Sequence, residues 1–213
     1  MNANAQEQTI DRLLQAAVEV FAELGFRDAT VREICKRANV NIASVNYYFR
    51  SKETLYEQAL TFAFSEVNKR YPYHTAQDGS LPPEQQLGLF ISNFLQKLTD
   101  NSQFGLHGKL IAREIADPTN ALDGIITTAI APQCHLLEGI LRRLLGAQTD
   151  ALTLQRCAMS IMGQCLMFKH SRSIIDRLFP ESVASPEAIQ ASADHITAFS
   201  LAALRHYPAT GTA

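Results

Sequence analysis

The residues with the clearest chemical potential lie within one short stretch, between Thr30 and Lys52. This stretch combines an amide, hydroxyl groups and phenols with several cations. An asparagine such as Asn46 can bind adenine through two hydrogen bonds, and serine, tyrosine and backbone amides bind phosphates. Six basic and two acidic residues between Arg27 and Lys52 give a local charge of +4, whereas the whole 213-residue chain carries −2. Such asymmetry favours one DNA-facing end in a protein that is not a polycation.

The elements that must position these residues are predicted to be two short helices. Thr30 is suited to cap the first helix, with Glu33 three residues on as in a capping box, and Asn41 is suited to cap the second. A helix, a tight turn and a second helix make a helix-turn-helix, which would pack through apolar side chains. These are Ile34, Ala38, Val40, Val45 and Phe49. By pattern alone, an ordinary helical hairpin with a solvated basic face is the alternative.

The fold class is predicted to be all-α. Glycine and proline are scarce, with 10 and 8 residues, and β-branched residues do not form alternating runs. Apolar spacing predicts helices near residues 9–25, 30–39, 41–49, 51–71, 84–99, 102–116, 119–145, 150–170 and 186–207, with a short piece at 173–178. We expect a three-helix helix-turn-helix domain over residues 1–55. A larger helical domain for ligand binding and dimerisation would span residues 56–213. Residues 71–83 are predicted to form the loop between the small N-terminal unit and the larger body.

Several other classes of protein are disfavoured. The first residues lack the apolar stretch of a signal peptide, and no apolar run approaches the ~20 residues that span a bilayer. We therefore expect a cytoplasmic protein without a membrane partner. The four cysteines form no CxxC pair, which argues against a zinc site or a disulfide scaffold and favours reduced, mostly buried thiols. With no phosphate loop or nucleophile motif, neither a cofactor nor an enzyme activity is expected.

The stretch TVREICKRANVNIASVNYYFRSKETL, residues 30–55, resembles the signature of the tetracycline-repressor (TetR) family of transcriptional regulators. The resemblance extends back to LLQAAVEVFAELG, residues 13–25, which is similar to the first helix of that family. It implies that Thr30, Tyr48 and Lys52 contact DNA phosphates. The positions that would face the major groove are Ile42, Ala43, Ser44, Asn46 and Tyr47. Many members have Gly or Pro at Ala43 and Leu-Tyr at Val45-Asn46, so base specificity does not transfer to Asn46.

The rest of the chain resembles the CerR-like subfamily over residues 110–145 and 160–178. The similar pieces are Ala112-Arg113-Glu114, Ala131-Pro132-Gln133 and Gly163-Gln164-Cys165-Leu166. The resemblance implies a C-terminal domain that holds an inducer pocket and a dimer interface.

Candidate pocket residues are apolar or titratable side chains of this C-terminal part. They are Phe90, Phe94, Phe104, His107, Arg113, Glu114, Met159, Met162, Met167, Phe168 and His170. Phe and Met at helical spacing are more often simple core residues, and histidines are more often structural than ligand-binding. Arg113 and Glu114 point about 100° apart on a helix, so they need not pair, and whichever faces inward requires a partner. This pair is the best polar anchor for a ligand.

Two features point to a homodimer. Gly163 lies inside a predicted helix, where glycine costs about 1 kcal/mol relative to alanine, and a close helix crossing would explain it. The last helix carries a stripe near heptad spacing, with small residues mixed in. Its members are Ile189, Ser192, Ile196, Phe199 and Ala203. The same stripe could instead make a contact within the chain.

The sequence thus predicts a repressor that binds a palindromic double-stranded DNA operator as a homodimer and is released by a small hydrophobic inducer. A regulator that senses no ligand, or that activates transcription, is the first alternative. An enzyme and a helical adaptor with a vestigial helix-turn-helix are further alternatives.

Overall fold

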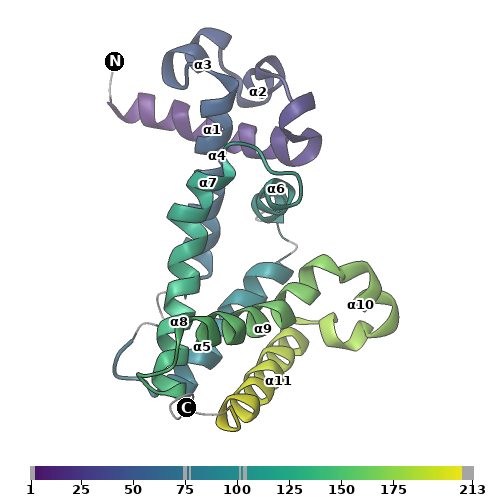
Figure 1. Cartoon of the computed structure of the whole chain (residues 1–213). Helices are drawn as coiled ribbons and strands as arrows, with labels where there is room; N and C mark the ends of the chain where they lie inside the picture. Colours follow the sequence, from purple (N-terminus) through teal and green to yellow (C-terminus); the bar gives the residue numbers. More distant parts are fainter. Residues whose placement is uncertain (1–2, 74–75, 77, 101, 103–104, 208–213) are drawn as a thin grey trace. The chain divides into compact units, whose positions relative to one another are not determined.

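The computed structural model describes residues 3–73, 76, 78–100, 102 and 105–207, with side chains from residue 6 onwards. All regular secondary structure in this part of the chain is helical, which confirms the predicted all-α class (Figure 1). None of the helices found there is both long and apolar enough to cross a membrane.

The chain folds into two compact units, each built from two separate segments. Unit 1 comprises Met1–Arg70 and Asn101–Ile130, and unit 2 comprises Tyr71–Asp100 and Ala131–Ala213. The predicted boundary after residue 55 concerns function and stays a prediction. By packing, the whole of the fourth helix and the segment 101–130 lie in the same unit as the helix-turn-helix. In a unit of only three helices, the apolar faces of the fourth helix and of this segment would be left uncovered.

Within its described residues, unit 1 contains seven helical elements around one core. They are α1 (Ala3–Asp28), α2 (Val31–Ala38), α3 (Ile42–Tyr48), α4 (Lys52–Arg70), α6 (Gly105–Ala116), α7 (Leu122–Ile125) and the π-helical η2 (Ile126–Ile130). α1 packs against α2, α4 and α6, and α4 packs against α6. Leu13, Phe21, Ile34, Leu55 and Leu110 are fully buried in this core. The helix-turn-helix is therefore held from behind by α1, which in turn contacts α6.

The caps predicted for the short helices are present. The Thr30 hydroxyl accepts a hydrogen bond from the Glu33 amide at 3.2 Å, and the Asn41 side chain accepts one from the Ala43 amide at 3.0 Å. The Ser51 hydroxyl accepts one from the Thr54 amide at 3.1 Å. Each bond satisfies an amide that a helix N-terminus otherwise leaves without an intrahelical partner, so the start of each helix is fixed locally.

The predicted single helix over residues 119–145 is wrong in detail. The segment divides into α7, the π-helical η2 and α8 (Ala131–Leu145). Pro132 has no N–H to donate, and the Thr128 hydroxyl bonds the Gly124 carbonyl at 2.8 Å. Because Pro132 lacks this donor, one bond of the regular backbone ladder is missing directly after the π turn, where α8 begins.

Unit 2 contains α5 (Pro83–Thr99), α8, α9 (Ala151–His170), α10 (Arg172–Leu178), the 3-10 helix η3 (Pro180–Val183) and α11 (Pro186–Arg205). The predicted helices are confirmed with small shifts at their ends. α5 packs against α8, α9 and α11, and its Leu87, Ile91 and Leu95 are fully buried. Of the α11 stripe, Ile189 and Ile196 are buried inside the chain, whereas Phe199 and Ala203 are exposed.

Gly163 is exposed on α9, and a Cβ built there would have no atom within 4 Å. No element of the described chain therefore crosses α9 closely at this point. The four cysteines are free thiols, three of them buried, as the sequence predicted.

The C-terminal end of α1 depends on Gly25 and Arg113. α1 begins earlier than predicted, at Ala3, but leaves helical geometry at Gly25 as expected, with φ 82° and ψ 172°. This region of backbone space is essentially restricted to glycine. The Arg113 guanidinium of α6 donates to the carbonyl oxygens of Glu23 and Leu24, at 3.4 and 3.2 Å. A Cβ at position 25 would lie 2.6 Å from Arg113 Nη2, so the guanidinium would have to give up these bonds.

We predict that Gly25→Ala lowers the free energy of unfolding by about 1–3 kcal/mol, because it imposes a forbidden backbone conformation and displaces Arg113. Urea denaturation measures this. Gly139→Ala, at a helical position with nothing within 4 Å of the new methyl group, is the control and should be neutral or slightly stabilising. Equal stability of Gly25→Ala and the wild type would contradict the role given to Gly25.

Candidate nucleic-acid interface

The helix-turn-helix is built as the sequence predicted. α2 and α3 pack together across a turn at residues 39–41, as Figure 1 shows. Ile34, Ala38, Val45 and Phe49 are buried, and the half-buried Val40 packs against the same core. Asn39 ends α2 in the left-handed conformation, with φ 54°, and donates to the Cys35 and Lys36 carbonyls. Asparagine is one of the few residue types that adopts this conformation readily, so it sets the turn at little cost.

The outer face of α3 is exposed to solvent. Tyr47 is 71% exposed and Ile42 is 44% exposed, although both carry large apolar surfaces. Ala43 and Asn46 are also exposed, whereas Ser44 and Tyr48 are half-buried. The Tyr47 and Tyr48 rings lie edge to face with centroids 4.9 Å apart, which restricts both phenols. The groove-facing roles of these residues stay predictions, but their accessibility is what such roles require.

The two predicted phosphate contacts outside α3 also serve the fold. Thr30 is exposed, but its hydroxyl already caps α2. Lys52 is half-buried, its Nζ donates to the Arg27 carbonyl at 3.1 Å, and it lies 4.7 Å from the centroid of the Phe26 ring. A loss of DNA affinity on replacing Lys52 would therefore combine a lost charge with a disturbed packing contact.

The local positive charge is only partly available to DNA. Arg37 is paired with carboxylates of α1 and α2: Glu23 at 2.9 Å, and Glu19 and Glu33 at 3.9 Å. Four other cations of the stretch have exposed side chains: Arg27, Arg32, Lys36 and Arg50. The structure thus separates the six basic residues into those that hold the unit together and those that face solvent.

Arg50 has an unusual backbone conformation for its residue type. It follows the end of α3 with φ 65°, and its amide donates to the Val45 carbonyl at 3.3 Å. A residue with a Cβ in the left-handed region costs roughly 1–2 kcal/mol, and glycine or asparagine normally occupies this place after a helix. Sequence analysis missed this residue, because a helix-ending arginine gives no signal until the backbone angle is known.

Arg113 and Glu114, predicted as a polar anchor for a ligand, form hydrogen bonds inside unit 1, and their ligand-binding role stays a prediction. Glu114 is 2% exposed and accepts three hydrogen bonds: from the Tyr56 hydroxyl at 2.8 Å, the Thr119 amide at 2.8 Å and the Thr119 hydroxyl at 3.0 Å. Burial, and then the hydrogen bond to Glu114, raise the pKa of Tyr56 above its usual value, so the phenol stays a donor. The inward-facing charge has its partner, as required, but the partner lies on α4.

The remaining ligand candidates do not form one cluster. His107 is buried in unit 1 beside Phe62, with ring centroids 6.0 Å apart, and burial lowers its pKa, which favours the neutral imidazole. In unit 2, Phe90, Phe94, Met162 and Phe168 belong to or pack against the core, and Met159, Met167 and His170 are exposed. Phe104 lies outside the described residues. Their ligand-binding role stays a prediction.

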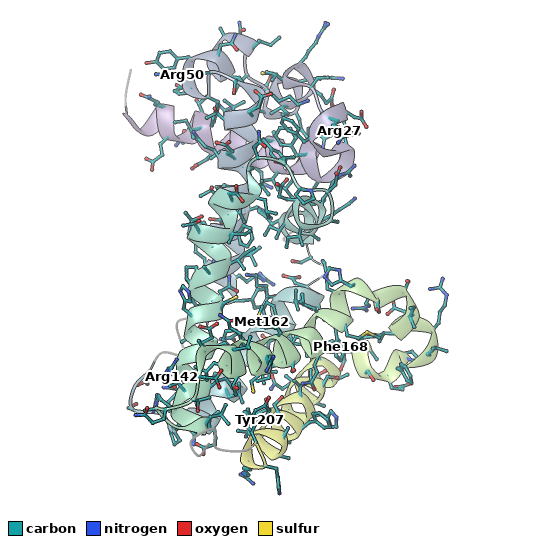
Figure 2. The ribbon with its side chains drawn as sticks, viewed as in Figure 1. Arg27, Arg50, Arg142, Met162, Phe168 and Tyr207 are labelled. Carbon is teal, nitrogen blue, oxygen red and sulfur yellow. The ribbon has the colours of Figure 1, made fainter. Side chains whose placement is uncertain are left out.

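Unit 2 does contain an open groove of about 590 Å³, between the end of α9, η3 and the start of α11. Most of its lining surface is apolar, and the lining includes a histidine and a glutamate. The lining residues are Gln164, Met167, Phe168, Glu181, Ser182, Ala188, Ala191, Ser192, His195 and Ile196. Phe168 and Met167 are therefore the pocket candidates that the structure places along a groove (Figure 2, with Phe168 labelled).

An exposed second helix on a capped helix-turn-helix defines a class of protein: helical, DNA-binding regulators. Comparison with known protein families assigns the chain more narrowly within this class. One family model, "Bacterial regulatory proteins, tetR family", matches residues 13–59, and another, "HTH-type transcriptional dual regulator CecR, C-terminal domain", matches residues 83–204. The second match covers more than half of the chain. The protein belongs to the TetR family of transcriptional regulators and carries a CecR-type C-terminal domain, which is the subfamily expected above as CerR-like.

Relatives and solved structures agree with this assignment. The HTH-type transcriptional dual regulator CecR of Shigella flexneri is 27% identical over 178 residues, 79% of each chain. The HTH-type transcriptional repressor NicS of Pseudomonas putida is 25% identical over 214 residues, 96% of this chain and 95% of the relative. The structure of FadR from Bacillus subtilis in complex with stearoyl-CoA has a TM-score of 0.67 at 18% identity, covering 90% of this chain and 97% of that one, which shows the shared fold.

We predict that Tyr56→Phe lowers the free energy of unfolding by about 1–3 kcal/mol, because the buried Glu114 carboxylate loses one of its three donors. Thermal or urea denaturation measures this. Tyr47→Phe removes an equivalent hydroxyl from an exposed ring and should change stability by less than about 0.5 kcal/mol. If the two variants are equally stable, the Tyr56–Glu114 bond does not hold α4 to α6.

Proposed function

We propose that the protein is a repressor that binds a palindromic operator as a homodimer and is released by a small hydrophobic inducer. The observation that carries this proposal is the accessible outer face of α3, with Asn46 and the 71% exposed Tyr47, on a firmly capped helix-turn-helix. Among the relatives, NicS is named a transcriptional repressor, and IcaR of Staphylococcus aureus is named a negative transcriptional regulator. CecR is named a dual regulator, which supports activation as a second mode of action.

Base recognition is assigned to α3. Asn46 is exposed one turn after Ile42, so both lie on the same side of the helix. The amide of Asn46 can pair with adenine and the side chain of Ile42 can contact a thymine methyl group. Tyr48, Thr30 and Lys52 are assigned to the flanking phosphates, which position the helix without reading sequence.

Dimerisation is assigned to the exposed sides of α9 and α11. Met159, Met167 and Phe199 are 64%, 45% and 59% exposed there. Gly163 lies between the two methionines on α9, with open space where its side chain would be. Large apolar side chains around a glycine on a helix surface fit the close approach of another helix, since the single chain leaves them in water. The residues of the α11 stripe are thus divided between two surfaces. Ile189 and Ile196 are buried inside the chain, whereas Phe199 and Ala203 are exposed.

The inducer site is assigned to the groove of unit 2 that Phe168 lines. Its volume of about 590 Å³ falls in the range of small-molecule sites, and most of its lining surface is apolar. FadR, which shares the fold, was crystallised with stearoyl-CoA, a ligand with a long apolar chain. An apolar acyl compound is therefore the first ligand class to test.

We predict that the dimer protects two half-sites in successive major grooves, about 34–36 Å apart or a small multiple of this. Asn46→Ala should reduce discrimination at particular base pairs by about 1–3 kcal/mol while binding to random DNA changes little. Footprinting and competition with random DNA measure both. Gln155→Ala, an exposed amide in unit 2, is the control. A single asymmetric half-site, or equal losses on operator and random DNA, would refute the assignment.

We further predict that an inducer weakens operator binding about 5- to 150-fold and that operator DNA weakens the inducer by the same factor, as linkage requires. Calorimetric titration of stearoyl-CoA and shorter acyl compounds into free and DNA-bound protein measures this. Phe168→Asp should abolish inducer binding but leave DNA binding intact. Leu178→Asp, an exposed position on α10, is the control. Equal inducer affinity for the free and DNA-bound protein would rule out allosteric release.

A further inference from the structure

The residue that follows α3, Arg50, has a left-handed backbone conformation that is more favourable for glycine or asparagine than for arginine. Two helix ends of the helix-turn-helix adopt the left-handed conformation: Asn39 after α2, with φ 54°, and Arg50 after α3, with φ 65°. At the first, the residue type matches the conformation. At the second, glycine or asparagine would relieve backbone strain, yet the chain has arginine. Strain of this kind is commonly retained where the side chain serves a function.

The side chain of Arg50 contributes no contact that would explain its presence. It is exposed, and it forms no ion pair or side-chain hydrogen bond with any residue that the structure describes. Its neighbours differ: Arg37 is paired with three glutamates, and Lys52 donates to the Arg27 carbonyl. Figure 2 shows Arg50 beside α3, at the opposite side of the helix-turn-helix from Arg27. The backbone conformation at this position therefore favours glycine, and only the charge favours arginine.

Position and charge define the partner. Arg50 directly follows the stretch Asn46–Phe49, which contains the exposed Tyr47 and the half-buried Tyr48 and ends with the buried Phe49. An anion that lies against this end of α3 would meet the Arg50 guanidinium, whose planar fork of donors fits a phosphate oxygen pair. We propose that Arg50 is a DNA-contacting residue that binds a backbone phosphate flanking the half-site, and that this contact is the reason why a strained arginine occupies the end of the recognition helix. The proposal rests on the proposed DNA-binding role of α3.

The test uses two substitutions in the full-length chain that separate strain from charge. Arg50→Gly relieves the backbone strain and removes the cation, whereas Arg50→Lys keeps both the strain and the charge. We expect Arg50→Gly to keep or raise the melting temperature, by up to about 4 °C, yet to weaken operator binding about tenfold or more. The slope of log K against log salt should fall by about one for each subunit bound. Arg50→Lys should keep the slope of the wild type.

The control is Arg177→Ala, which changes the net charge by the same amount in unit 2 and should leave the salt slope unaltered. A merely structural arginine would change stability and affinity in the same direction, so opposite signs for Arg50→Gly support the phosphate contact. Unchanged affinity and slope for Arg50→Gly, or a fall in melting temperature together with affinity, would overturn it. If the wild-type protein itself binds no operator, the proposed function of α3 fails, which is a separate result.

Discussion

Two adjacent side chains of α6 connect the structural helices of unit 1 to one another. Arg113 donates to the last carbonyls of α1, and Glu114, which is buried, accepts from Tyr56 of α4 and from Thr119. Because neighbouring residues on a helix point about 100° apart, one pair can reach two different helices. α1 supports the helix-turn-helix from behind, and α4 follows it directly in the chain. The position of α6 and that of the DNA-reading helices are therefore mutually constrained, and a shift of α6 must be accommodated by α1, by α4 or by loss of these bonds.

This constraint explains why unit 1 is larger than the helix-turn-helix itself. A buried carboxylate is tolerated only when its hydrogen bonds are made, and those of Glu114 need both α4 and the segment after α6. Gly25 belongs to the same arrangement, because its backbone angles turn the chain at the point where the Arg113 guanidinium lies. Burial of Tyr56 at 3% exposure keeps water away from the bond and keeps the phenol protonated. The side chains that bond α6 to α4 are therefore buried, and they are different residues from the exposed polar side chains of α3.

The charges of unit 1 are divided between support and recognition. The local charge of +4 near the helix-turn-helix overstates what DNA can use, because Arg37 is surrounded by three glutamates and Lys52 is tied to the Arg27 carbonyl and the Phe26 ring. The cations that remain in solvent lie near the end of α1, on α2 and after the end of α3. Among these cations, Arg50 is the residue whose backbone adopts the left-handed conformation. Recognition by such a protein depends on where the exposed cations lie rather than on net charge, since the chain as a whole is slightly acidic.

The sequence by itself determined the helical class, the helix-turn-helix with its caps at Thr30 and Asn41, and the family. These features are encoded locally, in apolar spacing and in side chains that bond amides two or three residues away. Only the tertiary structure decided the partners of Arg113 and Glu114, because Tyr56 is 58 residues from Glu114 in the chain. It also decided which half of the α11 stripe faces inward and where the 119–145 segment changes to a π-helix. The conformation of Arg50 belongs to the same group, since a side chain type alone does not report a backbone angle that sequence preferences disfavour.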